Sequence, residues 1–302
     1  MDRFQSLTEC LQRECPTLEL RRGEPMSRHT TFRVGGPVPL MALPRSEAEA
    51  AAAVSAAYRM ELRPFFLGNG SNLLVADQGA EVFVIKVMDG LNLCRTEGQT
   101  LIAGGGVLLA RAANYALEMG LTGLEFAHGI PGSAGGAVTM NAGAYDGEMS
   151  QVVRAVVCLT PNGETCRVTE LGFGYRHSLF DDGSRLILRV EFALQPGDPA
   201  AIRGRMDELI RRRREKQPLE YPSAGSTFKR PPGGYAAALI DQCGLKGLRV
   251  GGAQVSEKHA GFLINLGGAS CADIVALMDK VRDEVYRRTG VELEPEVKTL
   301  GL

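Results

Sequence analysis

Residues 129–145 read Gly-Ile-Pro-Gly-Ser-Ala-Gly-Gly-Ala-Val-Thr-Met-Asn-Ala-Gly-Ala-Tyr, and this stretch decides the fold. It contains five glycines and no charged residue. Because glycine has no Cβ, the main chain of such a loop can approach a bulky ligand closely. Consecutive N–H groups in the loop can also surround a diphosphate. The stretch therefore predicts a loop that contacts a phosphate-bearing cofactor.

A second loop of the same character lies at 67–74, Leu-Gly-Asn-Gly-Ser-Asn-Leu-Leu. Two such loops predict one large cofactor that is held from two sides. The plainer alternative is that each loop is a tight turn between core strands, which suits one loop better than two. A dinucleotide fold of the Rossmann type is not indicated, because the third glycine of Gly-x-Gly-x-x-Gly is Leu73 here.

The composition narrows the class of protein. The 302 residues carry 34 basic and 35 acidic side chains, whereas a nucleic-acid-binding protein should show a basic excess. The run Arg211–Arg214 continues a helical pattern, so we interpret it as a solvated helix end, where cations suit the helix dipole, and not as a polyanion-binding patch. No apolar stretch is long enough to cross a bilayer, and we expect no membrane contact.

The cysteines and histidines indicate neither disulfides nor a metal. Seven cysteines without a Cys-x-x-Cys pair are typical of a reduced, cytoplasmic protein. The N-terminus has no pattern of a secretory signal. The four histidines are dispersed, and we therefore expect no metal site. They lie at positions 29, 128, 177 and 259.

Mixed strands and helices without regular alternation predict an α+β fold. Ser46-Glu47-Ala48-Glu49 is a capping box that opens a helix to about residue 59. Further helices are expected at about 108–119, 202–214, 236–243 and 270–288, and strands at about 64–67, 82–87, 91–103 (a hairpin), 152–160, 166–169, 185–193, 250–255 and 261–266. Residues 129–145 are expected to be a loop throughout. Gln195–Pro199 is the best boundary candidate.

Motifs along most of the chain carry a family resemblance. They are His29-Thr-Thr-Phe-Arg-Val-Gly-Gly36, the two glycine loops, Met140-Asn-Ala-Gly143, Tyr175-Arg-His-Ser178, Pro222-Ser-Ala-Gly-Ser-Thr-Phe-Lys229, Ala238-Leu-Ile-Asp241 with Gly244-Leu-Lys-Gly247, and Leu293-Glu-Pro-Glu-Val297. In this order and spacing the sequence resembles the UDP-N-acetylenolpyruvoylglucosamine reductase family. These flavoenzymes complete UDP-N-acetylmuramate for bacterial peptidoglycan. The segment after Arg176 is short, and in this the sequence resembles the compact, type II form of the family.

The resemblance implies an FAD-binding region of the vanillyl-alcohol-oxidase (PCMH) type at 1–196, in two subdomains of roughly 1–86 and 87–196. It implies a substrate-binding α+β domain at 197–302, with a tail near residue 296 that returns to the active site. The cofactor would be noncovalent FAD, the reductant NADPH, and the substrate a UDP-sugar with an enolpyruvyl ether. We expect a monomer.

Three residues match the family's catalytic positions. Ser226 would donate a proton, although a turn serine that bonds its own backbone is the alternative. Arg176 would bind the substrate carboxylate through its planar guanidinium, against the alternative of a surface ion pair. Glu296 would be the third active-site group, with a solvated glutamate as the alternative and Glu294 as a nearby competitor.

The resemblance also assigns binding residues. For FAD they are Gly68, Asn69, Gly70, Ser71, Asn72, Gly129, Ile130, Pro131, Gly132, Ser133, Gly135 and Gly136, with Arg33 and Thr31 as weaker candidates. Tyr175, Lys216 and Lys229 are candidates for the UDP moiety or the phosphate of NADPH, although ordinary solvated side chains are a comparable interpretation. Two other functions stay open: a flavin oxidase of a hydroxylated small molecule, and a sensor that binds a nucleotide sugar without catalysis.

Overall fold

The structure, a computed structural model, describes residues 2–88 and 90–302 and has the predicted α+β class. By spatial contacts the chain divides into two units that interleave along the sequence. Unit 1 comprises Met1–Glu24, Pro39–Asn69 and Val82–Arg211, and unit 2 comprises Pro25–Val38, Gly70–Glu81 and Arg212–Leu302. The functional division at residue 196, with FAD before it and substrate after it, stays a prediction.

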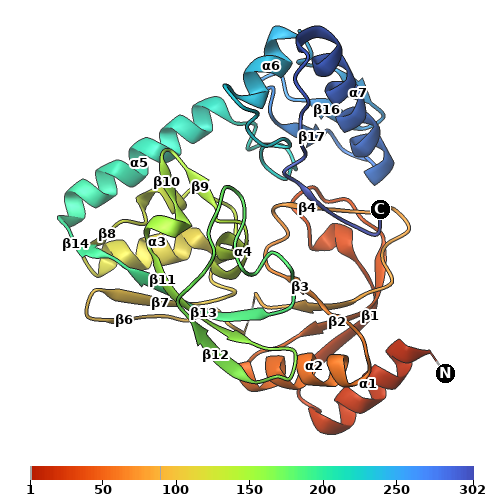
Figure 1. Cartoon of the computed structure of the whole chain (residues 1–302), viewed down its shortest axis with the longest axis vertical. Coiled ribbons are helices and arrows are strands. Elements are labelled where there is room, and N and C mark those ends of the chain that lie inside the picture. Colours follow the sequence, from red (N-terminus) through yellow and green to blue (C-terminus); the bar gives the residue numbers. More distant parts are fainter. Residues whose placement is uncertain (1, 89) are drawn as a thin grey trace. The chain divides into compact units, whose positions relative to one another are not determined.

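The first sheet of unit 1 has the order β1-β2-β5-β3, and β2, β5 and β3 run parallel. Two helices, α1 and α2, pack together and against this sheet, with apolar side chains of all three in one core (Figure 1). The bounds are α1 Arg3–Glu14, β1 Glu19–Pro25, β2 Pro37–Leu43, α2 Glu47–Arg59, β3 Phe65–Leu67 and β5 Phe83–Lys86.

Helix α2 begins where the capping sequence predicts. Ser46 Oγ accepts the Glu49 N–H at 3.1 Å, as an N-cap does. The Glu49 carboxylate accepts the N–H of Arg45 at 2.6 Å, one residue before the position that a capping box requires. Ser46 therefore caps the helix, and the Glu49 carboxylate holds the main chain of Arg45, the residue just before the cap.

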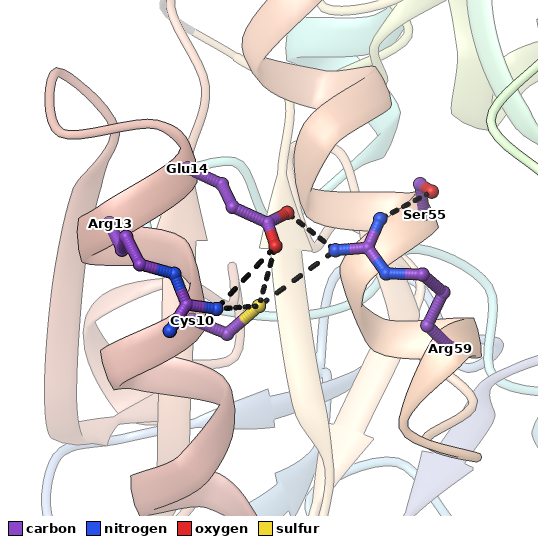
Figure 2. A network of polar contacts seen from close by, with 5 residues as sticks. All are labelled: Cys10, Arg13, Glu14, Ser55 and Arg59. Carbon is purple, nitrogen blue, oxygen red and sulfur yellow. Dashed lines mark hydrogen bonds and ion pairs between the residues drawn. The ribbon is translucent and has the colours of Figure 1, made fainter.

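A polar network joins α1 to α2 at the surface (Figure 2). Arg59 forms an ion pair with Glu14 and donates to Ser55 Oγ at 3.1 Å. Cys10 donates to the Glu14 carboxylate at 3.3 Å. The hydrogen bonds from Cys10 and Arg59 lower the pKa of Glu14. Because the side chains of Arg59 and Glu14 are largely exposed, their ion pair contributes little to stability.

The second sheet of unit 1 is antiparallel, with the order β12-β11-β13-β7-β6. Helix α4 packs on β13 and β7, and α3 contacts α4, so the two helices cover this sheet (Figure 1). The bounds are β6 Cys94–Glu97, β7 Thr100–Gly104, α3 Leu109–Glu118, α4 Ala134–Thr139, β11 Val153–Leu159, β12 Thr165–Val168, β13 Leu186–Ala193 and α5 Pro199–Lys216. The last turn of α5 belongs to unit 2.

Short elements connect these parts. They are η1 Met26–Arg28, β8 Leu121–Thr122, η2 Glu125–Ala127, β9 Gly143–Ala144, β10 Gly147–Glu148, η3 Met149–Gln151 and β14 Gln195–Pro196. Helix α5 ends in the arginine run, where Arg211, Arg212 and Arg214 are exposed, in agreement with a solvated helix end.

Unit 2 is a three-stranded antiparallel sheet, β15-β16-β17, packed against α7 and α6. A parallel pair, β4 with β18, brings the end of the chain beside residues 73–75. The bounds are β4 Leu73–Val75, α6 Ala236–Gln242, β15 Arg249–Val250, β16 Ala253–Val255, β17 Leu263–Asn265, α7 Cys271–Thr289 and β18 Lys298–Leu300. The single strand expected at 250–255 is wrong: Gly251, with φ 50°, turns the chain into a hairpin.

Within the described residues, all seven cysteines are free thiols. Cys158 and Cys166 lie opposite each other on β11 and β12, with their Sγ atoms 3.3 Å apart. Burial, and then the contact with Cys166, raises the pKa of Cys158 to about 12. Over the same part of the chain, no helix has both the length and the apolar character needed to cross a bilayer.

Asp77 ties residues 70–81 to α7. Its carboxylate accepts the N–H groups of Cys271 at 2.7 Å and Ala272 at 3.0 Å, and Ser270 is the N-cap of the same helix. A negative charge at this end also suits the helix dipole. Residue 77 and residues 271–272, which are far apart in sequence, are thus joined at the N-terminus of α7.

We predict that Asp77→Ala lowers the free energy of unfolding by about 1–2 kcal/mol, because two helix N–H groups lose their acceptor. Asp77→Asn keeps an acceptor without the charge and should lose about half of that amount. Urea denaturation of the two variants and the parent measures both values. A loss below about 0.3 kcal/mol for Asp77→Ala would contradict this view of the helix end.

Candidate functional site

The start of the first glycine loop, residues 67–69, lies beside the second glycine loop in unit 1. A Cβ on Gly68 would come within 2.2 Å of Ser133 Oγ, so a larger residue there would require the Ser133 side chain, which caps α4, to move. The Asn69 side chain donates to the carbonyl of Pro131 at 2.7 Å. Residues 68–69 therefore pack directly against residues 131–133, although more than sixty residues of sequence separate them.

The second loop ends in a helix, so the expectation of a loop throughout 129–145 is wrong. Ser133 is the N-cap of α4, and its Oγ accepts the Gly136 N–H at 3.3 Å. The N–H of Ala134 bonds the Val107 carbonyl at 2.7 Å, and that of Gly135 bonds Gly105 at 2.9 Å. These two amides are used inside the protein, whereas residues 129, 130 and 132 are half-buried and Pro131 and Gly136 are exposed, so these residues can face a ligand.

The remainder of the first loop belongs to unit 2. Gly70 has φ 62°, and a Cβ there would lie 2.0 Å from the His29 carbonyl oxygen. The N–H of Thr31 bonds Gly70 O at 3.1 Å, and Thr31 Oγ1 bonds Ser223 O at 2.6 Å. Thr31 thus connects the first loop to the segment that carries Ser226. Arg33 is exposed with φ 57°, a left-handed value that is uncommon for arginine.

These loops fit a flavin dinucleotide. At Gly70 backbone atoms leave no room for a Cβ, and at Gly68 a Cβ would collide with Ser133 Oγ; both positions border residues assigned to the cofactor. Close main-chain approach, together with amide and hydroxyl groups at Asn69 and Ser71, suits a diphosphate. The loops have the chemistry of a cofactor cradle, while the contacts of each residue with FAD remain a prediction.

Arg176 lies in a strained turn of unit 1. The N–H of Gly174 bonds His177 O at 3.0 Å, and Tyr175 and Arg176 occupy the two central positions. Arg176 has φ 55°, a value that such turns usually give to Gly or Asn. Its guanidinium lies over the Tyr175 ring, 5.1 Å from the centroid. Strain of this kind is typical of functional positions, and Tyr175 is 50% exposed beside it.

Ser226 and Glu296 come from segments that are joined within unit 2. The N–H of Glu296 bonds the carbonyl of Thr227, the residue after Ser226, at 2.8 Å. The carbonyl of Glu296 accepts the side-chain amide of Asn72 at 3.1 Å. Ser226 is exposed and Glu296 is half-buried. Asn72, expected at the cofactor, therefore also fixes the main chain of the proposed catalytic glutamate.

The structure separates Glu296 from Glu294. Both side chains would lie on one face of an extended segment, so spacing alone does not distinguish them. Glu294 is exposed and forms an ion pair with Lys229, and its carbonyl accepts the Lys229 N–H at 2.8 Å. Glu294 therefore has a structural partner, and Lys229, a candidate for substrate phosphate, is engaged by it.

Lys216 lies in a basic cluster that sequence reasoning did not define. Burial lowers the pKa of His259, and the nearby charges of Lys246 and Lys216 lower it further. Lys246 also bonds the Asp241 carboxylate at 2.9 Å. Lys246 lies within the motif Gly244-Leu-Lys-Gly247. That motif is the sequence feature that could have pointed to Lys246 as a further binding residue. Lys216 and Lys246 thus both lie near His259 in unit 2, and Lys246 is already paired with Asp241.

The proposed catalytic residues are divided between the units. Ser226 and Glu296 belong to unit 2, and Arg176 with Tyr175 belongs to unit 1. Within residues 2–88 and 90–302, no group of three or more His, Cys, Asp or Glu side chains is arranged to hold a metal ion.

Comparison with known proteins identifies both parts of the chain. Residues 38–169 match the model of an FAD binding domain. Residues 217–300 match the C-terminal domain of UDP-N-acetylenolpyruvoylglucosamine reductase.

Relatives match over nearly the whole length. The reductase of that name from Clostridium novyi is 49% identical, with 94% of this chain and 92% of the relative aligned. The one from Geobacillus thermodenitrificans is 45% identical, covering 100% of this chain and 99% of the relative. A crystal structure of the reductase from Thermus caldophilus superposes with a TM-score of 0.80 at 36% identity, covering 94% of this chain and 98% of that chain.

The backbone strain at Arg176 gives a stability prediction. We expect Arg176→Gly to unfold with a free energy about 1 kcal/mol higher than Arg176→Ala, because glycine adopts the left-handed conformation without the Cβ penalty. Urea denaturation measures the difference. If the alanine variant were as stable as the glycine variant, the left-handed backbone would not be a source of strain.

Proposed function

The chain belongs to the UDP-N-acetylenolpyruvoylglucosamine reductase family, and we propose that it reduces UDP-N-acetyl-3-O-(1-carboxyvinyl)-glucosamine to UDP-N-acetylmuramate. It is an FAD-dependent oxidoreductase of peptidoglycan precursor synthesis. We further propose that NADPH is the reductant, that FAD is held noncovalently, and that the protein acts as a cytoplasmic monomer.

The observation that carries this proposal is the packing of the two glycine loops, where Gly68 lies against Ser133 without room for a Cβ. A pair of tight turns does not require this approach of two distant loops. Bound FAD would supply the hydride transfer between nicotinamide and the enol carbon. Residues 68–72 and 129–136 would hold it, with Arg33 nearby.

Arg176 would bind the carboxylate of the enolpyruvyl group. Hydride addition places negative charge on that carboxylate, so a guanidinium held in advance stabilises the charge as it develops. A planar guanidinium can also form two parallel bonds to a carboxylate, which orients the double bond. The strained turn holds the arginine on a short segment with little freedom to move.

Ser226 would donate the proton to the carbon next to the carboxylate. A hydroxyl is a weak acid, so its neighbours must stabilise the charge that forms when the proton leaves. Glu296 is joined to the same segment through the Thr227 carbonyl and is the third group of the proposed site. Its position in unit 2, together with Ser226, supports a shared role in the proton step.

Tyr175, Lys216 and Lys229 remain the proposed contacts of the UDP moiety. The side chain of Lys216, with Lys246 near the same histidine, supplies positive charge that suits a diphosphate. The half-exposed ring of Tyr175 suits a sugar or a base. We propose that residues 197–302 bind the substrate, with Tyr175 contributing from the preceding region, and that the FAD contacts lie within residues 1–196.

We predict that Ser226→Ala slows reoxidation of the reduced flavin by the enolpyruvyl substrate by about 10²–10⁴-fold, the usual contribution of a positioned acid. Reduction of the flavin by NADPH should change less than about twofold, because no proton passes from Ser226 in that step. Anaerobic stopped-flow absorbance measures the two half-reactions separately.

Ser226→Cys, which keeps an ionisable proton, should retain more of the reoxidation rate than the alanine variant. Ser223→Ala in the same segment is the matched control. Equal reoxidation rates for Ser226→Ala and the parent would remove the proton-donor role. Reoxidation by oxygen alone, with no effect of the enolpyruvyl substrate, would instead favour an oxidase.

A further inference from the structure

The strained turn at Arg176 is held by one buried amide side chain. Asn141 Nδ2 donates to the carbonyl oxygen of Gly174 at 2.9 Å. Asn141 Oδ1 accepts the N–H of Ser150 at 2.9 Å. Both halves of the amide are therefore used, and the residue is only 2% exposed. Gly174 is the first residue of the turn, so this bond fixes the point from which Arg176 projects.

Asn141 has a left-handed backbone of its own, with φ 42°. Among residues with a side chain, Asn is one of the few that adopt this conformation readily. The N–H of Asn141 bonds the Val138 carbonyl at 3.1 Å, and the residue follows Met140, the C-cap of α4. The residue type thus satisfies two demands at once: a left-handed turn after a helix, and a donor for Gly174.

A second contact joins the same turn to the same helix. Ser178 Oγ donates to the carbonyl of Thr139, the last residue of α4, at 3.0 Å. Helix α4 begins at the cap Ser133, where the glycine loops meet. Six residues of helix span about 9 Å. One short rigid element therefore carries the cofactor loop at one end and the arginine turn at the other.

We propose that Asn141 is a positioning residue for Arg176, setting the place of the guanidinium through its hydrogen bond to the Gly174 carbonyl. This inference rests on the proposed function, in which Arg176 binds the substrate carboxylate. Asn141 does not itself contact substrate or cofactor in this account. Misplacement of a binding group by about 1 Å is enough to lose about 10²-fold in rate, so a single hydrogen bond to the turn has a measurable effect.

Asn141→Asp isolates the relevant bond. An ionised aspartate still accepts the Ser150 N–H but has no proton to donate to Gly174, and its size and its tolerance of the left-handed backbone are close to those of asparagine. Asn162→Asp, in the exposed turn between β11 and β12, adds the same charge elsewhere in unit 1 and is the matched control.

The readout is ligand binding to the FAD-loaded protein, measured by calorimetry. UDP-N-acetylglucosamine lacks the carboxylate, whereas the enolpyruvyl substrate has it, and their affinity ratio reports the arginine contact. We expect Asn141→Asp to lower the affinity for the enolpyruvyl substrate about tenfold and to leave UDP-N-acetylglucosamine within about twofold. Asn162→Asp should leave both unchanged. An equal loss for both ligands would show a merely structural role and overturn the proposal.

A double-mutant cycle separates this inference from the proposed function. If Asn141 acts through Arg176, then Asn141→Asp in an Arg176→Ala background lowers the substrate affinity no further. Additive losses would overturn the positioning role while leaving the function intact. If Arg176→Ala alone binds the enolpyruvyl substrate normally, the role proposed for Arg176 fails instead.

Two further measurements test the proposal if the Asn141→Asp variant does not fold. Asn141→Gly adopts φ 42° without strain and lacks both side-chain bonds, so it should show the same change in affinity ratio if the aspartate variant does not fold. Hydrogen exchange should rise at the His177 amide, whose bond to the Gly174 carbonyl closes the turn at 3.3 Å. Unchanged exchange in both variants would show that Asn141 does not hold the turn.

Discussion

The close approach of main chain at glycine is the constraint on which the rest of the structure depends. At Gly68 there is no space for a Cβ beside Ser133, and at Gly70 the carbonyl of His29 occupies that space. Within unit 1 the contact at Gly68 brings residues 68 and 133 together. Within unit 2 the contact at Gly70 brings residues 70 and 29 together. Because these contacts involve main chain and short polar groups, they give a surface that a large planar cofactor with a diphosphate can approach closely.

Helix α4 transmits this constraint to the proposed chemistry. Its N–H groups at Ala134 and Gly135 are bonded to the carbonyls of Val107 and Gly105, so the helix is fixed on the second sheet. The strained turn at Arg176 is attached to its other end. Strain at a functional group is stable only where the surrounding structure determines the backbone, and here the hydrogen bonds of Asn141 and Ser178 do so.

Much of the fold could be predicted from sequence, because helices with clear caps and periodic apolar faces carry local signals. α2 begins after Ser46 and α7 after Ser270, as the patterns indicate. Helix α4 could not be predicted, since glycine disfavours helices and the helix depends on tertiary contacts to residues 105–107. The role of Asn141 depends on contacts more than thirty residues away. Motif order gave the site residues, Glu296 included, whereas the ion pair of Glu294 with Lys229 could not be predicted because it joins residues that are far apart in sequence.

The most direct measurement of the central claim is the affinity of the protein for FAD, with and without a Cβ at Gly68. Visible absorbance and flavin fluorescence of purified protein report binding, and denaturation tests whether the cofactor is noncovalent. The account predicts a yellow parent protein that releases intact FAD when it unfolds, and a Gly68→Ala variant that folds but binds FAD at least about tenfold more weakly. A colourless parent, or a variant that holds FAD as tightly as the parent does, would contradict it.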